Sequence, residues 1–155
     1  MTSTNDGDPE DRLRALSWGP PPFASTAVAA AELRRRFDLL GATLRDGRIT
    51  PLEAARASAA IYDDVESRGY GVSPSDAVAY RLAQVDLLEV RAAFLGEVAS
   101  EADDPRFGEL ARVAAEICAE IRALDGPPDW RTGEPRAYFD LAVRSQQLNQ
   151  ELGLE

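Results

Sequence analysis

Apolar residues recur at every third or fourth position along most of this chain, which is the spacing of one face of an α-helix. No segment alternates apolar and polar residues with a period of two, as a half-buried strand does. Glycine and proline separate the periodic segments and mark helix ends and starts. The pattern predicts an all-α, single-domain bundle of about five helices, over about 26–44, 51–68, 76–100, 105–124 and 135–152.

The predicted helix at 76–100 is the longest, and it carries apolar residues on two sides. A helix that is apolar on two sides has to be covered by several neighbours, so we expect it at the centre of the bundle. The first stripe consists of Val78, Leu82, Val85, Leu88, Ala92 and Leu95, and the second of Leu87, Val90, Phe94 and Val98.

The clearest local signal is Thr50-Pro51-Leu52-Glu53, which has the form of a capping box with proline at the first helical position. The stretch 46–53 also resembles the latter part of an EF-hand calcium loop. Ala42 and Leu44 stand where that family has its first acidic ligands, and neither side chain binds calcium. We therefore expect a helix start here.

The chain divides into an N-terminal lead, 1–24, and a helical bundle domain, 25–152. The lead is acidic and is expected to be flexible, with a short helix ending near Leu16 and an extended connector at Gly19–Pro22. Trp18 and Phe23 flank the connector, and we expect them to hold it against the bundle.

Composition limits the chemistry available to this protein. All 17 basic residues are arginine, histidine and lysine are absent, and Cys118 is the only cysteine. The usual general base, the Schiff-base amine and a Cys/His zinc site are thus missing. Cys118 lies in a helical apolar pattern and is expected in the core. The composition favours a protein without enzymatic activity and without a cofactor.

Location and origin are also suggested by composition. The start of the chain is polar and acidic, unlike a signal peptide, and no apolar run is long enough to cross a membrane. We expect a cytoplasmic protein that does not contact a membrane. The abundance of alanine and arginine is typical of a bacterial protein from a GC-rich genome.

The net charge of −10 is concentrated in the second half, where residues 96–155 hold six arginines against thirteen acidic residues. Such a surface attracts a basic protein partner, or it serves only to keep the protein soluble. The leading hypothesis is a regulatory or accessory protein that binds a basic protein partner, and a homodimer is a further option for its assembly. The predicted contact residues are Glu109, Glu116, Glu120 and Asp140, with Trp130 and Tyr138 as aromatic anchors.

A second hypothesis rests on residues 71–78, Gly-Val-Ser-Pro-Ser-Asp-Ala-Val. They resemble the turn and the start of the recognition helix in helix-turn-helix DNA-binding domains. The resemblance implies a transcription regulator that uses residues 61–86, with Ser73, Ser75 and Arg81 near DNA. Gly69 and Tyr70 lengthen the turn, and a glycine stop followed by a serine-proline helix start explains the same residues.

A third hypothesis is a phosphohydrolase that binds magnesium or manganese through carboxylates alone. Alternatively, these acids are solvated and pair with Arg68 or Arg81. Arg34-Arg35-Arg36 is the only cationic cluster, and it is either an anion-binding patch or an ion-paired surface. The candidate metal ligands are Asp63, Asp64, Asp86 and Glu89.

Overall fold

The computed structural model describes residues 21–154 and confirms the predicted all-α fold. Within that range the chain forms helices joined by loops, and no strand is present apart from one isolated bridge between Asp129 and Glu134. The expected short helix near Leu16 and the position of Trp18 lie outside the described residues. The helices are α2 (Thr26–Arg45), α3 (Pro51–Arg68), α4 (Ala77–Glu101), α5 (Arg106–Arg122) and α6 (Arg136–Leu152).

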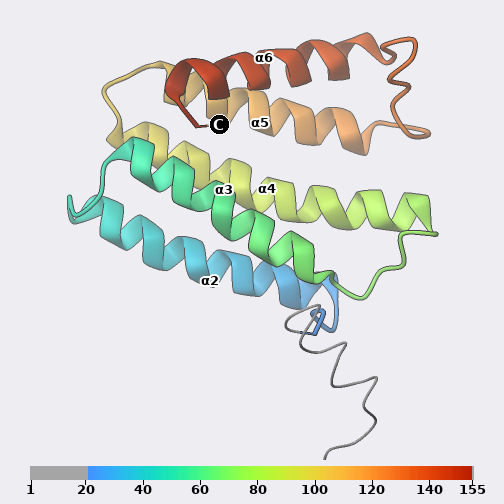
Figure 1. Ribbon diagram of the computed structural model, residues 1–155, viewed down its shortest axis with the longest axis horizontal. Helices are drawn as coiled ribbons and strands as arrows, with labels where there is room; N and C mark the ends of the chain where they lie inside the picture. Colours follow the sequence, from blue (N-terminus) through green and yellow to red (C-terminus); the bar gives the residue numbers. More distant parts are fainter. Residues whose placement is uncertain (1–20, 155) are drawn as a thin grey trace, which may run out of the picture.

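The longest helix, α4, runs through the middle of the bundle, as predicted (Figure 1). Helices α2 and α3 pack against it on one side and α5 on the other, while α6 packs chiefly against α5. The rings of Phe37 on α2 and Phe94 on α4 stack with centroids 4.8 Å apart. The most deeply buried large side chains are Tyr70, Leu33, Leu87, Leu148, Val65, Val85, Val98 and Val113.

The first turns of α4 differ from the prediction. Val78 and Leu82 were expected in a buried stripe, but they are 57% and 42% exposed. The reason is the length of α4, whose first turns extend past the start of α2 and the end of α5 (Figure 1). Later members of the two stripes do enter the core, among them Val85, Phe94 and Leu95.

Local signals explain where several helices begin. The capping box at the start of α3 is present, because the Thr50 hydroxyl accepts from the Glu53 amide and the Glu53 carboxylate accepts from the Thr50 amide. The side chains of Ser25 and Asp76 cap α2 and α4 in the same manner. The first helical turns therefore follow from short-range sequence.

The described end of the N-terminal connector is held against the end of α3. The Phe23 amide donates to the Gly69 carbonyl at 3.0 Å, and the guanidinium of Arg68 lies 3.9 Å from the centre of the Phe23 ring. Phe23 is only 8% exposed, so the prediction that it attaches the connector is confirmed. Gly71 has a φ of +77°, and a Cβ there would lie 2.7 Å from the Ala24 carbonyl oxygen.

Candidate functional site

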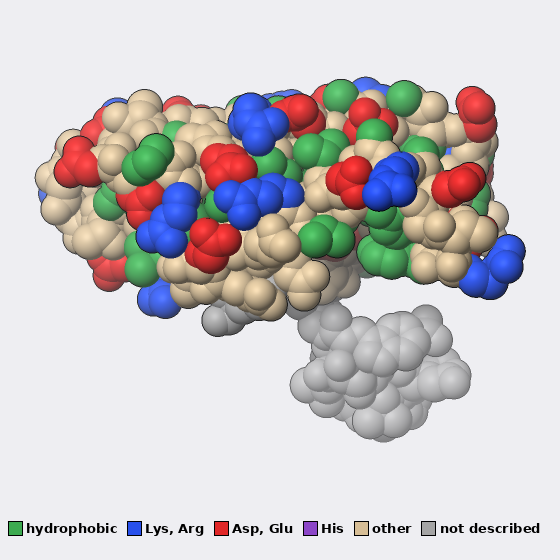
Figure 2. All heavy atoms as spheres, turned by 90° about the horizontal axis from the view of Figure 1, so that it is seen from above, with side chains coloured by type: hydrophobic (Ala, Val, Ile, Leu, Met, Phe, Trp, Pro, Cys, Tyr) green, Lys and Arg blue, Asp and Glu red, His purple; other side chains and the backbone are tan. Residues whose placement is uncertain are grey.

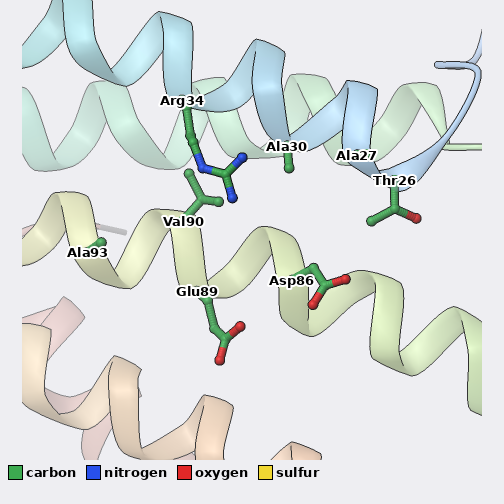
Figure 3. Close-up of a pocket in the computed structure, with 8 residues that line it drawn as sticks. All are labelled: Thr26, Ala27, Ala30, Arg34, Asp86, Glu89, Val90 and Ala93. Carbon is green, nitrogen blue, oxygen red and sulfur yellow. The ribbon is translucent and has the colours of Figure 1, made fainter.

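A hollow with a volume of about 440 Å³ lies between α2 and α4. Figure 3 shows the two helices side by side, with the Arg34 side chain reaching from α2 toward Val90 on α4. A second hollow of about 220 Å³ shares Arg34, Val90 and Ala93 and continues to Asp38 and Glu97. A third, of about 130 Å³, follows between Gly41 and Glu101. We call this continuous depression the α2–α4 groove.

Small side chains create the groove. Ala27 and Ala30 on α2 line the part of the groove near Asp86 and Val90, and Ala93 lies further along α4, so small side chains leave space between the two helices at the surface. Large side chains fill the inner edge, where Phe37 meets Phe94. The two helices thus pack tightly in the core and leave a shallow apolar floor at the surface.

The carboxylates at the first half of the groove are bound within the bundle. Arg122 of α5 donates to Asp86 at 2.6 Å and to Glu89, so one guanidinium holds both acids. The Arg122 hydrogen bond lowers the pKa of Glu89 below its ordinary value. In Figure 3 the Glu89 side chain points away from α2 toward α5. Arg34 forms no ion pair within residues 21–154, whereas Arg35 and Arg36 both bind Glu32.

The structure does not bring the four candidate metal ligands together. Asp64 on α3 binds Arg36 at 2.6 Å, while Asp86 and Glu89 bind Arg122. Within residues 21–154, no three or more His, Cys, Asp or Glu side chains are placed to hold a metal ion together, so Asp63 belongs to no such group. The expected pairing with Arg68 or Arg81 is wrong for Asp64, Asp86 and Glu89, which pair with Arg36 or Arg122, and Asp63 forms no ion pair within residues 21–154.

The acidic residues predicted to meet a basic partner lie on α5 and α6, and most of them are neutralised there. Arg144 donates to both carboxylate oxygens of Glu109, at 2.7 and 2.6 Å, which lowers the pKa of Glu109. Seen from above, arginine and acidic side chains alternate over this surface (Figure 2). The other ion pairs are Glu116 with Arg112 and Asp140 with Arg136, whereas Glu120 has none within the described chain.

The two predicted aromatic anchors lie beside each other at the start of α6. Trp130 is 74% exposed, and its ring stands edge-on to Phe139 at 4.7 Å. Tyr138 is half-buried and contacts the same phenylalanine ring at 5.1 Å. Only Trp130 keeps the exposed surface that an interface anchor needs.

The residues of the DNA-binding hypothesis lie at the start of α4. Ser73 and Ser75 are exposed, and their hydroxyl oxygens are 2.7 Å apart. Arg81 is half-buried beside Leu124 and Tyr138. The connection 69–76 between α3 and α4 is about twice the length of a helix-turn-helix turn. The rest of α4 is covered by α2, α3 and α5.

Sequence analysis missed a carboxylate on which several neutral donors converge. Glu66 on α3 accepts from the Tyr70 hydroxyl at 3.0 Å and from the Gln84 amide of α4 at 3.2 Å. The hydroxyls of Tyr62 and Tyr80 lie 3.5 Å from the same carboxylate. The spacing of residues 62, 66 and 70 was a visible signal, but the contribution of α4 depends on how the helices pack.

Comparison with known proteins found no matching family model, no matching curated protein and no matching solved structure. Among the described residues, none of the helices has the length and apolar character needed to cross a membrane. The function therefore has to be argued from the geometry of the chain itself.

Proposed function

We propose that this protein is a non-catalytic helical module that binds a basic amphipathic helix of a partner protein in the α2–α4 groove. The observation that carries the proposal is the groove itself, a series of adjoining hollows that small apolar residues and charged residues line together. The proposal keeps the basic partner predicted from the net charge and moves its contact surface from α5 and α6 to α2 and α4.

The size and floor of the groove suit a helix. From Ala27 to Gly41 the groove follows about 20 Å of α2, at a rise of about 1.5 Å per residue. That length corresponds to roughly four turns of a bound helix. The small side chains of Ala27, Ala30 and Ala93 let the backbone of a partner approach closely, and its apolar face would cover Val90.

The charged residues along the groove indicate which partner it prefers. In the second half of the groove the acidic residues Asp38, Glu97 and Glu101 outnumber the arginines, which are Arg34 and Arg45, and Arg45 lies 3.9 Å from Glu97. Asp38 and Glu101 form no ion pair within residues 21–154, so they are available to arginine or lysine side chains of a partner. Arg34 in the middle of the groove would pair with one acidic residue of the partner and so fix the register of the bound helix.

The absence of catalysis in this proposal rests on composition. The chain has no histidine and no lysine, and the described carboxylates of the groove are bound by arginines or face solvent. Neither the DNA-binding nor the hydrolase hypothesis has a comparable geometric support among the described residues.

The experiment that tests the proposal uses two labelled model peptides, each an amphipathic helix of about four turns. One carries leucine and lysine, the other leucine and glutamate, and binding is followed by fluorescence anisotropy. Ala93→Trp fills the groove floor, and Ala115→Trp is the matched control at an exposed alanine of α5. We expect the lysine peptide to bind, and Ala93→Trp to weaken binding by about tenfold, or about 1.4 kcal/mol.

Charge reversal provides the second arm. Asp38→Arg combined with Glu97→Arg should weaken binding of the lysine peptide by about tenfold or more. Glu116→Arg on α5 should change that binding little. If both peptides bind equally, or if Ala115→Trp and Glu116→Arg have the same effect as the groove variants, the proposal is wrong.

A further inference from the structure

Arg91 of α4 is a partly buried arginine with an unpartnered Nε atom. Its side chain is half-buried, and its Nε atom is inaccessible and has no hydrogen-bond partner in the described chain. It lies on a different face of α4 from the α2–α4 groove, toward α5 and α6. Asp86 and Glu89 on the same helix pair with Arg122 of α5, whereas Arg91 forms no ion pair within residues 21–154.

Burying a guanidinium without an acceptor is unfavourable, because the lost hydration is not replaced. Burial lowers the pKa of Arg91, and the nearby Tyr62 and Asp63 oppose this lowering without a hydrogen bond to the guanidinium. Natural proteins keep such a group where it serves a ligand or an ordered water. The space around Arg91 indicates whether a ligand or a water molecule fits beside it.

A cavity of about 100 Å³ adjoins the Arg91 side chain between α4, α5 and α6. Its volume is about three times the share of one water molecule in the liquid, which is roughly 30 Å³. Ser145 offers a hydroxyl, and Cys118 a thiol whose pKa is raised by burial to about 11, so the thiol is neutral near pH 7 and supplies no counter-charge. The remaining lining is apolar and consists of Leu88, Leu95, Ala114 and Ile117.

We propose that Arg91 and this cavity form a binding site for a short-chain monocarboxylate of about two to four carbons. The carboxylate would accept hydrogen bonds from the terminal nitrogens of the Arg91 guanidinium and from the Ser145 hydroxyl. The hydrocarbon end would pack against Leu88 and Ile117. A longer chain exceeds the cavity, and a neutral amide of the same shape lacks the charge that Arg91 requires. This inference does not depend on the proposed partner groove.

The test is ligand-observed NMR and calorimetry with acetate, propionate and butyrate at constant ionic strength, with propionamide as the neutral control. Arg91→Gln removes the charge and keeps a hydrogen-bond donor. Arg81→Gln is the matched control, because Arg81 is a half-buried arginine on the same helix. We expect saturable propionate binding that Arg91→Gln weakens at least tenfold and that Arg81→Gln leaves unchanged, with propionamide bound at least tenfold more weakly.

Ala114→Val provides a variant that keeps Arg91 and reduces the cavity. This variant should weaken the binding of butyrate more than the binding of acetate. Circular dichroism establishes that each variant is folded. If propionate does not bind, if propionamide binds equally well, or if Arg91→Gln has no effect in a folded protein, the inference is wrong. None of these outcomes bears on the peptide assay with Ala93→Trp, so the two proposals fail independently.

Discussion

The hydroxyl of Tyr70 donates a 3.0 Å hydrogen bond to the carboxylate of Glu66, although Tyr70 is only 1% exposed. Burial and the neighbouring Glu66 charge raise the pKa of Tyr70 well above its ordinary range, so the phenol remains a donor at every physiological pH. The ring also stacks on Tyr80 at 5.7 Å. This one residue therefore joins the end of α3 to the start of α4.

We predict that Tyr70→Phe costs about 1 kcal/mol of stability, because it removes one hydrogen bond and keeps the ring. Tyr70→Ala should cost about 3–5 kcal/mol, because a large buried ring is lost. Urea unfolding followed by circular dichroism measures both. Equal losses for the two variants would show that the ring contributes nothing beyond its hydroxyl.

Gly71 and Gly47 form a matched pair for backbone strain. Both have a positive φ, but a Cβ at Gly71 would meet the Ala24 carbonyl, whereas nothing lies within 4 Å of one at Gly47. We predict that Gly47→Ala costs about 1 kcal/mol for the left-handed backbone alone. Gly71→Ala should cost about 2 kcal/mol or more, since the contact adds to the strain. Thermal unfolding of the two variants in parallel decides this; a smaller cost at position 71 contradicts it.

Stability in acid should depend on Glu32. Hydrogen bonds from Arg35 and Arg36 lower the pKa of Glu32 to about 2, below the ordinary value of 4.5. The native state thus holds the ionised form more strongly than the unfolded chain does. The resulting stabilisation is present above about pH 4.5 and is lost as the pH falls toward 2.

Unfolding by urea at several pH values between 7 and 2 checks this prediction. Wild type should lose more stability across the acid range than Glu32→Gln, and added salt should reduce the difference because the pair is near the surface. Parallel curves for the two proteins would contradict the assignment.

Cys118 should be nearly inert in the native protein. It is 3% exposed, which confirms the prediction of a core cysteine, and burial raises its pKa from 9.0 to about 11. A rise of two units lowers the thiolate fraction about 100-fold near neutral pH. Reaction with a chromogenic disulfide should therefore be at least about 100-fold slower than in denaturant. Rapid modification of folded protein would show that the thiol is accessible.

Short-range features of this fold could be predicted from sequence, and contacts between helices could not. The Thr50–Glu53 capping box depends on residues three apart, so it was readable along the chain. The binding of Asp86 and Glu89 by Arg122 depends on how α4 and α5 pack, and nothing in the sequence sets that register. The acids therefore looked like a candidate metal site although each was already paired.

The candidate groove was also hidden in the sequence. Alanines such as Ala30 and Ala93 predict close helix packing, and only the arrangement of α2 and α4 shows that they leave a surface depression. Val78 and Leu82 show the opposite error, since their spacing indicates burial but they are 57% and 42% exposed. Hydrophobic periodicity shows which face of a helix is apolar. It does not show how far the neighbouring helices extend along that face.

Helix α6 rests chiefly on α5, with one added tether where Arg56 donates to the Gly153 carbonyl at 2.7 and 3.0 Å. An outer element attached in this way is the first part of a bundle to detach in a native-state fluctuation. Its backbone amides should consequently exchange with deuterated solvent sooner than those of α4. Because Ser145 of α6 borders the Arg91 cavity, such a fluctuation would widen the access of small solutes to it.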